Sequence, residues 1–270
     1  GFRIDTPTAQ VVDLGTAFGI ELAADGVSQV SVFDGEVEVG LTATDTKQLL
    51  SEGEAIRVNT DQHIEEVPFD ASAYEKIWPV SSGLAGSSGA FRFAPPWPRR
   101  LRLVRSDTDI FVIPERYTVT LEAPIDVNVS APGTYVRKDQ LTPRTLSSGQ
   151  SVRSFILHYH PEEARRPRHA ERISGSIVFD RPVLGLILRH DELSASAGRF
   201  SPRNAGELHE RRQIELSGGP AGDEVILSPD RCTVTLNLTS PNKTSDLVRV
   251  IVDASIPSPD DRVNQTGRQP

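Results

Sequence analysis

The chain has 270 residues, of which 37% are hydrophobic, so it is long enough for one large or two ordinary domains and too apolar for wholesale disorder. It contains no run of about 18 apolar residues, the length that a membrane-spanning helix needs. Its one cysteine, Cys232, excludes an internal disulfide and a zinc site built from several cysteines.

Charge divides the chain near residue 90. Residues 1–90 hold four basic and fifteen acidic residues, net −11, whereas residues 91–270 hold 25 basic and 22 acidic residues, net +3. A run of small residues at 81–89 and a proline cluster at 95–98 lie at the same place, as is typical of a linker. The acidic first part argues against nucleic acid as a partner, because a duplex binder needs a basic face. We expect a first domain over 1–80, a linker over 81–98, a second domain over 99–255 and a disordered tail over 256–270.

The first domain is predicted to consist of short strands, because apolar and polar residues alternate along it. The runs are broken by three turn signals, Asp25-Gly26, Asp34-Gly35 and Glu52-Gly53. Residues 28–33 and 36–41 are expected to pair as a hairpin across a two-residue turn, since Gly35 supplies the positive φ that such a turn needs. One short helix is expected over 70–78.

The second domain is predicted to be an antiparallel β-sandwich, since its strand-like runs recur at roughly ten-residue spacing. These runs cover residues 109–113, 117–121, 125–129, 152–160, 173–180, 183–188, 224–227, 233–238 and 247–252. No glycine-rich strand-to-helix element separates them, which argues against the nucleotide sites of α/β folds. The fold class is therefore all-β, with at most one short helix.

The first part also carries an ordered series of motifs. They are Phe2-Arg-Ile-Asp-Thr-Pro-Thr-Ala9, Val11-Val-Asp-Leu-Gly-Thr-Ala-Phe-Gly-Ile20, Val30-Ser-Val-Phe-Asp-Gly-Glu-Val-Glu-Val39 and Leu50-Ser-Glu-Gly-Glu-Ala55. The series resembles the C-terminal portion of the FecR-like domain family, in a planctomycete-type variant. The resemblance implies an extracytoplasmic all-β domain, which in the best-known member relays the state of an outer-membrane transporter to a sigma factor. The family's first hairpins are missing, so we expect the chain to begin inside the domain.

His158 and His160 are weak candidates for a metal site. They lie two residues apart on a predicted strand, so both imidazoles face one side of the sheet, where His169, His190 or Asp191 would supply a third ligand. The same spacing is typical of two surface histidines at the end of a strand, and we favour that interpretation.

No pattern in the chain predicts catalysis. Cys232 lies in a strand-like run and is predicted to be a buried, inert thiol, and the Gly-x-Ser-x-Gly elbow of hydrolases is missing. We expect no catalytic residue, no cofactor and no enzyme activity.

The leading functional hypothesis is a periplasmic or extracellular, non-catalytic module of FecR type that binds or regulates another envelope protein. Membrane contact is expected only through an N-terminal region outside this sequence, and the oligomeric state stays open. The alternative is a structural or glycan-contacting surface protein whose C-terminal sandwich engages polysaccharide. Residues 151–158, 173–187, 223–228 and 246–251 resemble β modules of secreted, sorting-tagged bacterial surface proteins, but no function of those modules follows from the motifs. For an aromatic glycan platform the candidates are Trp97, Tyr117, Tyr135 and Tyr159.

Overall fold

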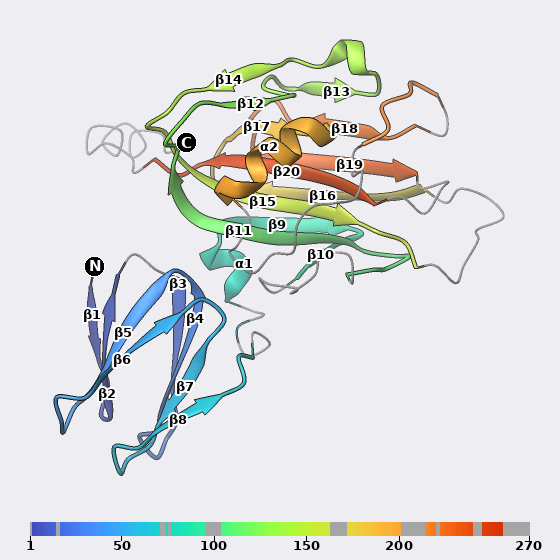
Figure 1. Ribbon diagram of the computed structural model, residues 1–270. Helices are drawn as coiled ribbons and strands as arrows, with labels where there is room; N and C mark the ends of the chain where they lie inside the picture. Colours follow the sequence, from blue (N-terminus) through green and yellow to red (C-terminus); the bar gives the residue numbers. More distant parts are fainter. Residues whose placement is uncertain are drawn as a thin grey trace, which may run out of the picture. The chain divides into compact units, whose positions relative to one another are not determined.

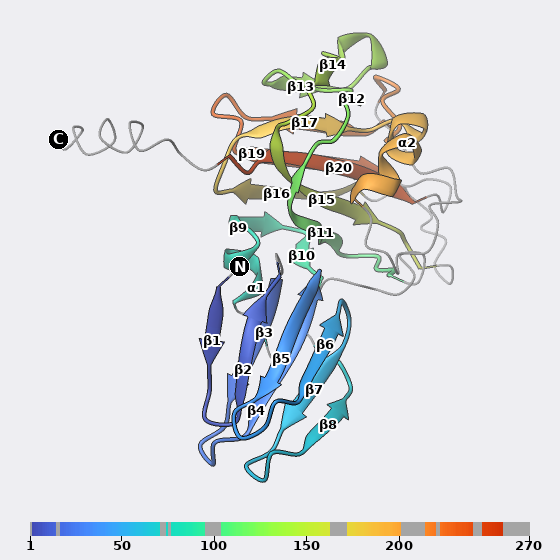
Figure 2. The same cartoon turned by 60° about the vertical axis from the view of Figure 1, so that its left-hand side comes forward.

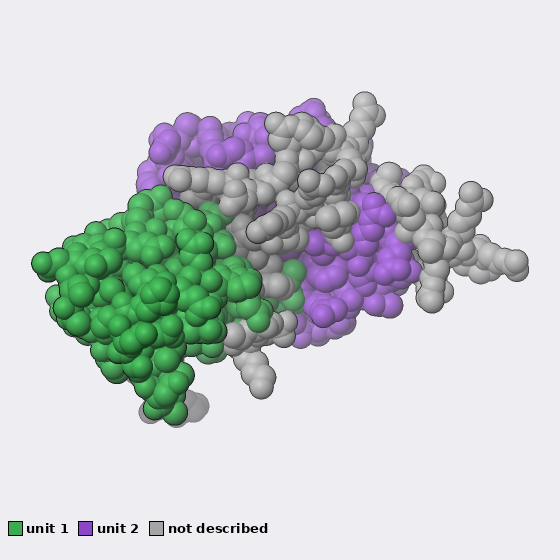
Figure 3. Space-filling view, turned by 60° about the horizontal axis from the view of Figure 1, so that its bottom comes forward, with its two compact units in different colours: residues 1–82, 93–103, 202–206 green, residues 83–92, 104–201, 207–270 purple. Residues whose placement is uncertain are grey.

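The computed structural model describes residues 2–14, 17–70, 74, 77–94, 104–162, 172–200, 214–219, 222–239 and 245–255. The described residues are mostly β-strands, with one helix longer than a single turn, so the all-β prediction is confirmed (Figure 1). None of their helices is long and apolar enough to cross a membrane. The chain forms two compact units (Figure 3), unit 1 with residues 1–82, 93–103 and 202–206, and unit 2 with residues 83–92, 104–201 and 207–270.

Unit 1 is a sandwich of two four-stranded antiparallel sheets, β1-β2-β5-β6 and β3-β4-β7-β8 (Figure 2). Consecutive strands pair as hairpins, and the chain alternates between the two sheets from one hairpin to the next. The strands are β1 (Arg3–Asp5), β2 (Ala9–Asp13), β3 (Ala17–Leu22), β4 (Ser28–Asp34), β5 (Glu36–Leu41), β6 (Lys47–Ser51), β7 (Ala55–Val58) and β8 (Ile64–Val67).

The core of unit 1 is built mainly from small branched side chains. Burial alternates along β2 and β5, so every second residue faces the opposite sheet. The core comprises Ala9, Val11, Val30, Val32, Val37, Val39, Leu50, Ile56 and Val58. Because these residues come from both sheets, the two sheets are held together face to face by apolar burial.

The predicted hairpin over 28–41 is wrong. Gly35 has the expected positive φ, +84°, but β4 and β5 belong to different sheets and each pairs with two other strands. The turn therefore carries the chain from one layer to the other. The physical reason is strand pairing across the whole sandwich, in which β4 pairs with β3 and β7 and β5 pairs with β2 and β6, while Val32 and Val37 stay buried on either side of the turn.

The predicted linker over 81–98 is wrong for residues 84–93, and its residues 95–98 lie outside the described part of the chain. Residues 84–89 form strand β9, which pairs with β16 of unit 2, and residues 91–93 form β10, beside β11. The small residues serve close packing here. A Cβ on Gly89 would lie 2.5 Å from the Ser174 carbonyl oxygen, and one on Gly175 would lie 2.9 Å from that of Ser88. The predicted tail over 256–270 lies outside the described residues.

Unit 2 contains two five-stranded sheets, β10-β11-β15-β20-β17 and β13-β18-β19-β16-β9, together with a two-stranded ribbon of β12 and β14. The antiparallel sandwich predicted for this part is thus present. The strands are β9 (Leu84–Gly89), β10 (Phe91–Phe93), β11 (Ile110–Thr120), β12 (Ile125–Val127), β13 (Gly133–Tyr135), β14 (Arg144–Leu146), β15 (Ser151–Tyr159), β16 (Arg172–Phe179), β17 (Val183–Ile187), β18 (Glu224–Leu227), β19 (Thr233–Thr239) and β20 (Asp246–Asp253).

Helix α2 (His190–Phe200) packs against the sheet that contains β20 (Figures 1 and 2). Its buried side chains are Leu193, Ser196 and Phe200, which share one face of the helix. Residues 246–252 of β20 are all buried, as expected of a strand covered on both faces. Of the helix expected over 70–78, residues 71–73, 75 and 76 lie outside the described residues, and the four-residue α1 (Trp78–Ser81) begins at its last position.

A buried ion pair joins α2 to this sheet. The Arg249 guanidinium, fully buried on β20, donates from Nε and Nη2 to the two carboxylate oxygens of Glu115 on β11, at 2.7 and 2.8 Å. Its Nη1 donates to the Leu193 carbonyl oxygen at 2.9 Å and to Ser196 Oγ at 2.5 Å. Ser154 Oγ donates to Glu115 at 2.6 Å. Because all these donors find acceptors, the pair fixes the helix on the sheet.

Candidate functional site

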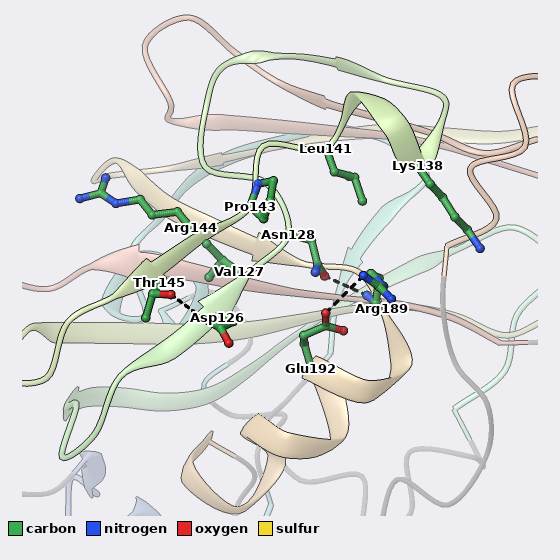
Figure 4. Close-up of a pocket in the computed structure, with 10 residues that line it drawn as sticks. All are labelled: Asp126, Val127, Asn128, Lys138, Leu141, Pro143, Arg144, Thr145, Arg189 and Glu192. Carbon is green, nitrogen blue, oxygen red and sulfur yellow. Dashed lines mark hydrogen bonds and ion pairs between the residues drawn. The ribbon is translucent and has the colours of Figure 1, made fainter.

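A pocket of about 450 Å³ lies in unit 2 between the β12–β14 ribbon and the start of α2 (Figure 4). Its wall is formed mostly by polar and charged side chains. The lining residues are Asp126, Val127, Asn128, Lys138, Leu141, Pro143, Arg144, Thr145, Arg189 and Glu192. They come from β12, the 3₁₀ turn η3 (Lys138–Gln140), β14, α2 and the loop residues next to these elements, so tertiary packing assembles the pocket.

Asn128 holds the two sides of the pocket together. Its side-chain Oδ1 accepts hydrogen bonds from the backbone N–H groups of Leu188, at 2.7 Å, and Arg189, at 3.0 Å. Next to it, Val129 and Leu186 exchange backbone hydrogen bonds at 2.9 and 3.1 Å. These bonds tie the ribbon to the segment that enters α2, so the wall is preorganised.

The charged groups of the pocket are only partly paired. Asp126 accepts a 2.6 Å hydrogen bond from Thr145 Oγ1, and Glu192 Oε1 lies 3.7 Å from Arg189 Nη1. Glu192 Oε2 is buried and has no hydrogen-bond partner. Lys138 and Arg144 make no ion pair with any described residue, and Figure 4 shows them on opposite sides of the pocket. Three cations and two carboxylates therefore line the pocket.

A smaller chamber of about 130 Å³ continues the pocket along α2. Asp126 and Glu192 line both chambers, so these carboxylates stand at their junction. In the smaller chamber Arg199 Nη1 already donates to the carbonyl oxygens of Ala123 and Pro124, at 2.8 and 2.9 Å. The unsatisfied charge thus belongs to the larger chamber.

The predicted metal candidates His158 and His160 lie elsewhere and are buried, so the expected surface position is wrong. Their rings stand edge to face with centroids 6.0 Å apart, and His158 Nε2 lies 3.1 Å from the Val104 carbonyl oxygen. Strand β15 is buried on both faces at this end, which covers the histidines. Within the described part of the chain, no three His, Cys, Asp or Glu side chains are grouped to hold a metal ion. His169 lies outside that part.

Two of the candidate aromatic residues are also buried. Tyr135 and Tyr159 are 3% and 6% exposed, and the Tyr135 hydroxyl donates to the Ala131 carbonyl oxygen at 2.5 Å. They form no platform, because both rings pack in the core of the sandwich. Trp97 and the Tyr117 side chain lie outside what the structure describes.

Cys232 is partly buried, and burial raises the pKa of its thiol, with smaller contributions from Asp230 and Asp180. A thiol with a raised pKa is a poor nucleophile at neutral pH. The predicted buried position within a strand is wrong, because the residue is only partly buried and β19 begins one residue later, at Thr233.

A pair of buried carboxylates lies outside the pocket. Asp223 accepts hydrogen bonds from the backbone N–H groups of Glu215 and Thr239, at 2.7 and 2.8 Å, yet burial raises its pKa. Burial, and then the charges of Asp223 and Glu215, raise the pKa of Asp246 well above its usual value. These groups affect stability, because the charged form of Asp246 is disfavoured in the fold.

Sequence reasoning did not find the pocket. Asp126 and Glu192 are 66 positions apart, and neither stands in a motif. The one local signal was the acidic start of α2, where Asp191 and Glu192 occupy the first turn. Comparisons with known protein families, with curated proteins and with solved structures found no match to this chain.

Proposed function

We propose that the chain is a non-catalytic binding module that works outside the cytoplasm by contacting another envelope protein through unit 1. The observation that carries the proposal is the distribution of exposed apolar side chains. Among the described residues, the strongly exposed large hydrophobic side chains all belong to the acidic unit 1. They are Phe2, Leu14, Leu22, Leu49, Ile77 and Val80.

Part of this apolar surface is concentrated at one end of the sandwich. The Phe2 carbonyl oxygen accepts a 2.8 Å hydrogen bond from the Asp13 N–H, which places Phe2 beside the residue before Leu14. The Phe2 ring stacks on Phe18 with centroids 5.9 Å apart. We call Phe2, Leu14 and Phe18 the Phe2 patch. Apolar side chains surrounded by polar surface are typical of a protein interaction site.

The resemblance of the same segment to FecR-like domains supports an extracytoplasmic partner. The non-catalytic role is proposed from this resemblance and from the exposed apolar surface. The pocket does not carry that part of the proposal, because its Lys138, Thr145, Asp126 and Glu192 are residue types that can also act in catalysis.

Affinity capture from the envelope fraction of the source cells, with the full chain as bait, tests the proposal. We expect one specific protein, which a Phe2→Ser, Leu14→Ser double variant loses and which a Leu49→Ser variant keeps. Circular dichroism of each variant confirms that the strands remain. Contact through the Phe2 patch would be refuted if all three baits recovered the protein equally. It would also be refuted if the full chain recovered no protein in a greater amount than an unrelated acidic bait does.

Glycan contact by unit 2 is the second candidate, and the pocket is the observation that favours it. Polar side chains of both charges in a preformed concave site are suited to a hydroxyl-rich ligand. A glycan array probed with the full chain tests this function. We expect the Arg189→Gln, Glu192→Gln double variant to lose a glycan that the unaltered chain binds. If the variant still binds that glycan, the pocket is not the binding site.

A further inference from the structure

We infer that the pocket of unit 2 binds an acidic saccharide, a sugar that carries carboxylates beside its hydroxyl groups. The inference rests on the second candidate function and names the ligand class of that site. It follows from two unmet requirements of the pocket, one for hydrogen-bond donors and one for negative charge.

Donors are required by Glu192. Its side chain is only 25% exposed, its nearest cation lies 3.7 Å away, and its Oε2 has no hydrogen-bond partner. A carboxylate withdrawn from water without donors is destabilised by desolvation. Rotation about the last side-chain torsion, which is soft, turns either oxygen toward the pocket. Asp126, on the same wall, receives a single bond from Thr145 and accepts more.

These donors are not cationic. Lys138, Arg144 and Arg189 outnumber the two carboxylates of the pocket, so a further positive group is repelled and a negative one is attracted. Hydroxyl groups supply donors without adding charge. A ligand that satisfies both requirements therefore combines hydroxyls, directed at Glu192 and Asp126, with carboxylates, directed at the cations.

The positions of the cations favour an oligomer. Lys138 and Arg144 stand on opposite sides of the pocket in Figure 4, with Arg189 beside Glu192 between them. A single carboxylate faces one of these groups at a time, whereas carboxylates on successive sugars face both sides. Val127, Leu141 and Pro143 add apolar wall, on which the C–H face of a sugar ring packs without an aromatic residue.

Calorimetric titration of the full chain with three probes tests the inference. Trigalacturonate carries hydroxyls and carboxylates, its methyl ester keeps the hydroxyls without the charge, and triglutamate keeps the charge without the hydroxyls. We expect trigalacturonate to bind at least about tenfold more tightly than either of the other two, the effect of one charged hydrogen bond.

Glu192→Gln separates specific recognition from simple attraction. The change removes a negative charge, so a site that only attracts anions binds trigalacturonate more tightly. If Glu192 accepts from the hydroxyls of the ligand, exchanging its charged acceptor for a neutral amide weakens binding, by about tenfold. Lys138→Gln is expected to weaken the binding of trigalacturonate and to leave the binding of its methyl ester unchanged. Glu66→Gln in unit 1 and Arg181→Gln outside the pocket are the matched charge controls and leave affinity unchanged.

The outcomes distinguish the inference from the function on which it rests. Equal binding of triglutamate, or tighter binding by Glu192→Gln, overturns the saccharide and assigns an acidic peptide or a nonspecific anion. If no probe binds while the glycan array still retains a neutral glycan through the pocket, glycan contact stands and the acidic class is wrong. If neither method detects a ligand, both fail.

Discussion

Replacing Arg249 by methionine removes the cation of the buried pair and leaves the Glu115 carboxylate in the core with an uncharged donor, the Ser154 hydroxyl. Both side chains are almost fully buried, at 0% and 4% exposure, so water does not replace the lost hydrogen bonds. Breaking such a pair from one side destabilises a protein by about 3–5 kcal/mol. For a unit of this size we expect the melting temperature to fall by about 6–20 °C.

A double-mutant cycle measures the pair itself. Glu115→Leu alone is expected to destabilise unit 2 by about 3–5 kcal/mol, because it leaves the buried Arg249 guanidinium without its carboxylate. The double variant Arg249→Met, Glu115→Leu is expected to lose only about 1–3 kcal/mol, since no buried charge is left and the groups that lose a partner, the hydroxyls of Ser154 and Ser196 and the Leu193 carbonyl, are uncharged.

Hydrogen exchange by mass spectrometry is the suitable assay, because the chain has two units and a single melting curve mixes them. Peptides from β20 and α2 should lose protection, while peptides from β4 in unit 1 serve as the internal control. Additive single effects, with the double variant about 6–10 kcal/mol less stable, would refute the reasoning.

Three further predictions concern single residues. Gly19→Ala should destabilise unit 1 by about 1–3 kcal/mol in a urea titration, because a Cβ there would lie 2.3 Å from Tyr74 Cε1. Gly86→Ala is the control and should be nearly neutral in the same assay, because its Cβ would have no atom within 4 Å. The raised pKa of Asp246 means that the folded state holds this proton more tightly, so stability is greatest below the unfolded pKa and falls as pH rises through the folded pKa. Asp246→Asn should flatten that decline above about pH 4, the unfolded pKa of an aspartate, in denaturant titrations, and an unchanged slope would contradict the assignment. Iodoacetamide should alkylate Cys232 more slowly than it does glutathione at pH 8, because burial raises the thiol pKa, and equal rates would disprove this.

Sequence periodicity predicted which residues of unit 1 are buried, but not which strands pair. Alternation places Val32 and Val37 on inward faces, and both are in the core. It carries no information about whether a turn at Gly35 closes a hairpin or joins two layers, because both arrangements bury the same side chains. Partner choice depends on packing across the whole sandwich.

The parts of unit 2 that sequence reasoning missed depend on long-range contacts. Glu115 and Arg249 are 134 positions apart, and each is an isolated charge in an apolar strand until the fold brings them together. Helix α2 lacks a strong apolar stripe, since Leu193 and Phe200 are its only large buried side chains. The same contacts place Glu192 at the pocket. The sequence therefore predicted neither helix α2 nor the candidate site that depends on it.

Photo-crosslinking from position 14 tests the central claim most directly. The full chain, with a benzophenone amino acid in place of Leu14, is irradiated in the envelope fraction of the source cells, beside a control that carries it in place of Glu66 on β8. The account predicts one discrete protein adduct from position 14 and none from position 66. Identical adducts from both positions, or no adduct from position 14 in a folded chain, would contradict the claim that unit 1 contacts a protein partner through the Phe2 patch.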